Sequence, residues 1–132
     1  IHEARVVPLD GRPHVSDSIK SYMGDSRGHW EGNTLVVETK NLNGQTAVGG
    51  NGGGRTSDRI TITERFTMLD ANTLQYTATI DDPGTWTRPW TLSFPWKREP
   101  KYGMFEYACH EGNYAMRNML TISRAAEGNA TK

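Results

Sequence analysis

Charged side chains interrupt the apolar side of three segments in which apolar and polar residues alternate. These charges belong to Glu64, Arg88 and Glu106, and His110 continues the pattern beyond Glu106. Tyr76 adds a phenol on a segment between the first two. If the segments are neighbouring antiparallel strands, inward-facing residues that lie opposite each other are roughly 5 Å apart. The pattern therefore predicts that two carboxylates, a guanidinium, an imidazole and a phenol converge in one place.

Two interpretations of this cluster stay open at the level of the sequence. Burying such charges costs on the order of several kcal/mol each unless they are paired. In the first interpretation, Arg88 forms a structural ion pair with Glu64 or Glu106 at one end of the fold. In the second, the charges orient a ligand whose apolar part rests on aromatic walls. The predicted ligand-binding residues are then Trp30, Phe66, Tyr76, Trp86, Arg88 and Trp90.

The same cluster allows an enzymatic alternative. Glu106, Glu64 or His110 would act as the base, and Arg88 or Tyr76 would stabilise a developing anion. Such an enzyme would be a cofactor-independent isomerase, lyase or hydrolase. A third alternative is a structural or interaction module whose interior is filled by side chains. The leading prediction is binding of a small apolar or aromatic molecule, and the catalytic candidates are Glu106, His110, Glu64 and Arg88.

Signatures of other chemistry are absent from the sequence. There is no G-x-S-x-G nucleophile motif and no closely spaced histidine pair that would suggest a metal site. Cys109 is the single cysteine, and on a strand it would face away from His110. The six glycines between Gly44 and Gly54 lack the lysine of a phosphate-binding loop. We therefore expect no metal and no cofactor, and we expect the glycine-rich loop 43–58 to be flexible.

Alternation with a period of two is the main structural signal, and it is typical of half-buried antiparallel strands. The predicted strands are residues 4–9, 27–31, 34–39, 59–69, 73–81, 85–96, 103–110 and 118–124. Residues 16–23 are predicted as one short helix, with Gly24 at its end. About eight such strands usually close, because closure removes exposed edges. The predicted fold is all-β, a single antiparallel barrel spanning residues 1–132 with one short helix.

Composition narrows the class of partner. The chain has 132 residues with 15 basic and 15 acidic side chains, so its net charge is zero. A neutral chain is a poor electrostatic partner for nucleic acid or an anionic membrane surface. No apolar run approaches the roughly 20 residues of a membrane span. We expect no nucleic-acid binding and no membrane insertion, and a homodimer is left open.

Two resemblances to known families add to this interpretation. Gly28-His29-Trp30 resembles the G-x-W motif of lipocalin-like (calycin) barrels, which implies that Trp30 packs under Arg124 of the last strand. Most of the chain also resembles a family of uncharacterised, apparently exported bacterial proteins, whose members extend further at the N-terminus. That second resemblance implies a periplasmic or secreted location and no particular activity. It rests on LDGRPH (9–14), MGDSRGHWEGNTLVVET (23–39), ERF (64–66), TLQYTATIDDP (73–83), TRPWTL (87–92) and YACHEGNYAM (107–116).

Overall fold

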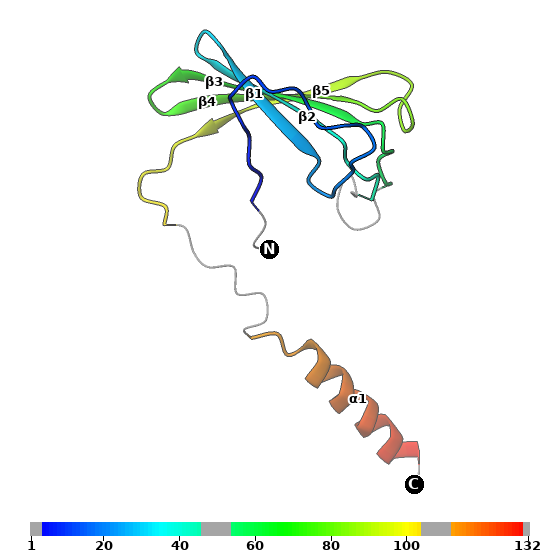
Figure 1. The fold of residues 1–132 in the computed structure, drawn as a ribbon. Coiled ribbons are helices and arrows are strands. Elements are labelled where there is room, and N and C mark those ends of the chain that lie inside the picture. The colour runs from blue at the N-terminus through cyan, green and yellow to red at the C-terminus, as the bar shows by residue number, and fades with distance from the viewer. Residues whose placement is uncertain (1–3, 46–53, 104–111, 131–132) are drawn as a thin grey trace. The chain divides into compact units, whose positions relative to one another are not determined.

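The structure is a computed structural model that describes residues 4–45, 54–103 and 112–130. The chain divides into two units, His2–Pro100 and Lys101–Lys132, and Ile1 is grouped with the second. The first unit holds the sheet and the second holds a helix (Figure 1). Within the described residues, no helix is long and apolar enough to cross a membrane.

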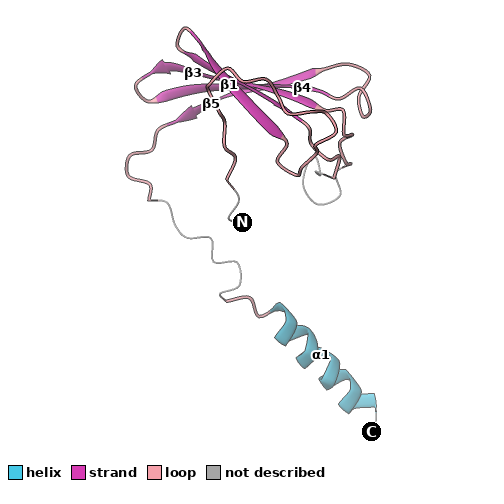
Figure 2. Ribbon diagram, in the orientation of Figure 1, coloured by secondary structure: helices cyan, strands magenta, loops and turns pink. Residues whose placement is uncertain are grey.

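The first unit contains one twisted sheet whose five strands pair with their sequence neighbours (Figures 1 and 2). All four pairings are antiparallel. The strands are β1 (Asp25–Glu31), β2 (Thr34–Lys40), β3 (Thr61–Asp70), β4 (Thr73–Asp81) and β5 (Trp90–Lys97). Gly32 turns the chain between β1 and β2 with a φ of 60°, a conformation that glycine adopts without strain. Between β3 and β4, the Asp70 carboxylate accepts a hydrogen bond from the Asn72 N–H at 2.8 Å.

The strand register confirms the predicted alternation in β3, β4 and β5. One row across the sheet is Val37, Glu64, Ala78 and Leu92. This apolar face carries a buried core of Leu42, Ile60, Ala78 and Ile80, against which larger side chains such as Trp86 and Trp90 pack. The opposite face is rich in hydroxyl groups: the Thr34 and Thr67 hydroxyl oxygens are 2.7 Å apart, and those of Thr79 and Thr91 are 2.9 Å apart. The sheet is therefore apolar on one face and polar on the other, as expected for half-buried strands.

Residues 5–9 cross the apolar face beside β1 and do not form the predicted strand. The Gly28 N–H donates a hydrogen bond to the Pro8 carbonyl at 2.9 Å. A Cβ at Gly28 would lie only 2.5 Å from Leu9 Cδ2 and 2.9 Å from Val7 Cγ1, so a larger residue here would require these side chains to move. We call residues 5–9 the N-terminal strap.

The predicted barrel is wrong, because the sheet has five strands and is not closed. Three predicted elements also differ. Residues 16–23 form a turn and irregular chain instead of a helix. The predicted strand 85–96 begins only at Trp90. Residues 118–124 belong to α1 (Ala115–Ala130), whose Met, Leu, Arg and Ala residues are good helix formers. Strand 103–110 falls almost entirely outside the described residues.

Candidate functional site

Glu64 is the buried charge of the sheet, only 7% exposed. Its Oε2 accepts a hydrogen bond from Arg5 Nη1 at 2.5 Å, and its Oε1 accepts one from the Tyr76 hydroxyl at 2.9 Å. Arg5 also reaches the Thr39 hydroxyl at 3.5 Å. The alternation pattern predicted that Glu64 and Tyr76 lie together, and this is confirmed, but it did not predict that Arg5 joins them. The sequence feature that could have pointed to Arg5 is its position as a lone charge in the apolar run at residues 4–9.

Tyr76 is held as a neutral phenol. Burial raises its pKa, and the hydrogen bond to the Glu64 carboxylate raises it further, to about 12. The Arg5 guanidinium opposes the shift without cancelling it. The phenol therefore acts as a hydrogen-bond donor to Glu64 at neutral pH and is fixed at the centre of the apolar face.

Three aromatic rings, those of Phe66, Phe94 and Trp96, surround this phenol, and we call these three rings and Tyr76 the ring cluster. Register places Phe66 opposite Tyr76 and Tyr76 opposite Phe94. The Tyr76 centroid lies 5.1 Å from that of Phe66 and 5.3 Å from that of Phe94. Trp96 stacks on Tyr76 at 4.8 Å with an interplanar angle of 9°. Such contacts stabilise each ring by about 0.5–1.5 kcal/mol beyond area burial, so the cluster is a preformed surface.

The ring cluster is open on one side. Phe94 is 41% exposed and Trp96 is 45% exposed, although both lie on the apolar face of β5. Met68 lies in the same register row as Trp96, with Leu74 between them, and it is 48% exposed. A cleft of about 270 Å³ adjoins Trp96 where β5 ends. Exposed aromatic and apolar surface of this kind is what ligand sites present.

The structure separates the other predicted site residues from this cluster. Arg88 is exposed in the loop before β5, so the interpretation in which Arg88 forms a structural ion pair with Glu64 is wrong, and the alternative partner Glu106 is not among the described residues. Trp86 and Trp90 pack edge to face at 5.5 Å in the core beside Ile80. Trp30 is 61% exposed on β1, and Arg124 lies in α1, so the last strand on which the lipocalin-like motif places this arginine is wrong. Glu106 and His110 lie outside the described residues.

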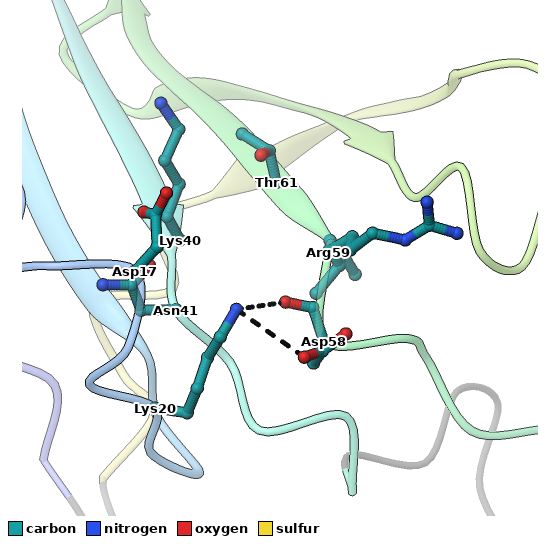
Figure 3. A pocket seen from close by; sticks show the side chains of 8 residues that line it. Asp17, Lys20, Lys40, Asn41, Asp58, Arg59 and Thr61 are labelled. Carbon is teal, nitrogen blue, oxygen red and sulfur yellow. Dashed lines mark hydrogen bonds and ion pairs between the residues drawn. The ribbon is translucent and has the colours of Figure 1, made fainter.

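A second hollow of about 450 Å³ lies between the loop at 17–20 and the start of β3 (Figure 3). Lys20 Nζ reaches across it to the Asp58 carbonyl at 2.5 Å and lies 3.9 Å from the Asp58 carboxylate. Lys40, on its edge, pairs with Glu38 at 2.8 Å. The Arg59 side chain extends away from both lysines (Figure 3). Both lysines are thus engaged by oxygen atoms of the protein, and the hollow is less suited to an anion than its three cations suggest.

Asp82 joins two loops beside this hollow. It is 1% exposed, and its carboxylate accepts hydrogen bonds from the Ser57 N–H at 2.7 Å and the Thr85 hydroxyl at 2.6 Å. The Ser57 hydroxyl and the Gly84 N–H donate to the same carboxylate. Burial by itself would raise the pKa of Asp82, but these hydrogen bonds outweigh it and hold the pKa below its usual value. All of these contacts lie within the protein, so the role of Asp82 is structural: it joins the two loops.

His14 is the only described histidine enclosed by carboxylates on both sides. Its Nδ1 lies 2.8 Å from Asp25 and its Nε2 lies 3.0 Å from Glu38. Each ring nitrogen faces a different carboxylate, so the three groups do not converge on a common point. Among the described residues, no group of three or more His, Cys, Asp or Glu side chains is arranged to hold a metal ion.

No family model, curated protein or solved structure matches this chain.

Proposed function

We propose that the ring cluster binds a small apolar or aromatic molecule. One observation carries the proposal: four rings contact one another on the apolar face, and two of them, Phe94 and Trp96, are more than 40% exposed. If these rings served only as the core of the sheet, other side chains would cover them. The site is an open face of a sheet, and it replaces the enclosed barrel cavity expected from the sequence.

The arrangement favours affinity because the surface is already ordered. Tyr76 is fixed by its hydrogen bond to Glu64 and by the stacked Trp96 ring. A ligand that covers apolar surface gains about 25 cal/mol for each Å² removed from water. Little rotamer entropy is lost, since the rings already hold one another.

Binding is a better assignment than acid–base catalysis for the described residues. The two oxygens of Glu64 are occupied by Arg5 and Tyr76, so neither is directed at a substrate. Arg88 lies away from the cluster in a loop. The periplasmic or secreted location stays a proposal that rests on sequence resemblance alone.

The test is a titration with a neutral aromatic probe, 2-naphthamide, followed through the indole N–H resonances of the four tryptophans. The Trp96 resonance should shift, and the buried Trp90 indole should not. Trp96→Ala and the milder Trp96→Leu should weaken binding by about tenfold, which corresponds to roughly 1.4 kcal/mol of lost contact. Tyr22→Ala is the matched control, because Tyr22 is an aromatic residue that is 59% exposed and lies outside the cluster.

Thermal unfolding of each variant separates loss of the site from loss of the fold. Trp96→Leu should unfold close to the wild-type temperature, since nearly half of the Trp96 side chain is exposed. If 2-naphthamide binds the folded Trp96→Ala or Trp96→Leu variant as tightly as the wild type, or does not bind the wild type at all, the proposed function is wrong.

A further inference from the structure

The cleft at the end of the ring cluster combines apolar walls with positive charge. Its volume is about 270 Å³, and it lies between the β3–β4 turn and the end of β5. The lining residues are Met68, Ala71, Asn72, Leu74, Trp96, Lys97 and Arg98. Two of these are cations, and no carboxylate lines the wall. The lining is thus complementary to an apolar molecule that carries a negative charge.

Trp96 connects this cleft to the ring cluster. One side of its ring system stacks on Tyr76 at 4.8 Å, and the same residue lines the cleft. Met68 stands at the opposite wall and is 48% exposed. A flat ligand resting on Trp96 would therefore have the two cations at one end.

A backbone hydrogen bond anchors the segment that carries the two cations. The Arg98 N–H donates a hydrogen bond to the Asn72 carbonyl at 2.8 Å, which ties the chain after β5 to the β3–β4 turn. Neither Lys97 nor Arg98 forms an ion pair within 4.0 Å of another described residue. Among the described residues, the Asp70 carboxylate attracts Lys97 only weakly, so both cations remain able to bind an anion in the cleft.

Asp70 is the acidic group of this turn, and it is engaged locally. Its carboxylate accepts a hydrogen bond from the Asn72 N–H at 2.8 Å. That bond, followed by the one from the Thr73 side chain, lowers the pKa of Asp70, and the charge of Lys97 adds a weaker attraction. Asp70 does not line the cleft, so its carboxylate does not occupy the place that an anionic ligand would take.

We infer that the ligand is an aromatic carboxylic acid, with its ring on Trp96 and its carboxylate between Lys97 and Arg98. This inference rests on the proposed function, because the same ring cluster supplies the apolar contact. Arginine and lysine bind carboxylates through charge-assisted hydrogen bonds, which are shorter and stronger than neutral ones. Since these cations are solvent-exposed, the charge should contribute selectivity more than affinity.

A matched pair of probes tests separately the binding of an aromatic molecule and the preference for a negative charge. 2-Naphthoate and 2-naphthamide have nearly the same shape and differ in charge at neutral pH. The wild type should bind 2-naphthoate about tenfold more tightly, and raising the ionic strength from about 0.05 M to 0.5 M should reduce this preference. Lys97→Gln and Arg98→Gln should each reduce the preference severalfold and leave 2-naphthamide binding unchanged.

Arg59→Gln is the charge-matched control, because Arg59 is also an exposed cation but lies outside this cleft. It should leave both dissociation constants unchanged. If both probes bind equally and shift the Trp96 indole, the proposed function stands and the anion preference is refuted. If the preference survives in Lys97→Gln and Arg98→Gln, or falls equally in Arg59→Gln, the cleft is not its source. Failure of 2-naphthamide to bind the wild type would overturn the proposed function itself.

Discussion

Arg5 and Glu64 are joined by an ion pair of 2.5 Å, although 59 positions separate them in the chain. The carboxylate side chain is 9% exposed and the guanidinium side chain is 32% exposed. This pair holds the N-terminal strap on the apolar face and leaves Glu64 with both oxygens satisfied. Because Glu64 also binds the Tyr76 hydroxyl, the ion pair links the N-terminal strap to the ring cluster.

Replacing Arg5 by Met should destabilise the protein by about 2 kcal/mol, because it leaves a buried carboxylate without its cation. The exposed fraction of Arg5 keeps the loss below that of a fully buried pair. Arg12→Met is the matched control: Arg12 pairs with Asp10 at 2.6 Å, but its side chain is 71% exposed. That variant should change stability by no more than about 0.5 kcal/mol. Urea denaturation measures both values, and equal losses would contradict the role assigned to Arg5.

Tyr76 should make stability depend on pH at the alkaline end. Its folded pKa of about 12 is above the unfolded value of about 10. The folded state therefore retains the phenolic proton where the unfolded state has lost it. This contribution is complete below about pH 10 and falls as the pH rises toward about 12. Absorbance titration of tyrosinate in the wild type and in Tyr76→Phe isolates this group among the five tyrosines. A Tyr76 transition near pH 10 would contradict the prediction.

Asp82 should contribute stability that acid removes. Its folded pKa is lowered, so the contribution is present above the unfolded value of about 3.9 and is lost as the pH falls below it. Asp82→Ala should destabilise the fold at neutral pH by about 3 kcal/mol, because four hydrogen-bond donors lose their acceptor. The adjacent Asp81 is exposed, so Asp81→Ala is the control and should cost less than about 1 kcal/mol. Chemical denaturation at several pH values compares the two variants. Similar losses of stability in both would rule out the structural role of Asp82.

Gly28→Ala should loosen the N-terminal strap. Its new Cβ would lie 2.5 Å from Leu9 Cδ2, so the Leu9 side chain or the whole strap must shift. We expect a loss of about 1 kcal/mol and faster amide exchange around the Gly28–Pro8 hydrogen bond. Gly54→Ala is the control, because a Cβ there meets nothing within 4 Å. Adding Leu9→Ala to Gly28→Ala should restore part of the protection, and no change in exchange for Gly28→Ala would show that the strap is not held as described.

Period-two alternation was enough to predict the faces of β3 and β4, because side chains on a strand point alternately to opposite sides whatever their partners are. The same local rule placed Glu64 and Tyr76 on one face, where they bond at 2.9 Å. It failed for residues 118–124, which lie in α1. A short apolar run fits a strand and a helix equally well, and its own residues carry no further information.

The tertiary structure decided which arginine pairs with Glu64. The sequence places apolar residues on both sides of Glu64, and a carboxylate in such a place needs a positively charged partner. Arg5 and Arg88 both carry a suitable charge, and the local sequence pattern does not say which of them pairs with Glu64. Only the path of the strap brings Arg5 to the carboxylate, and only the late start of β5 leaves Arg88 in an exposed loop. Pairing over long sequence separations depends on which segments the whole sheet brings together, and no local pattern records it. Closure of the sheet is a property of the same kind: five strands that alternate correctly form an open sheet whose aromatic face is exposed along β5.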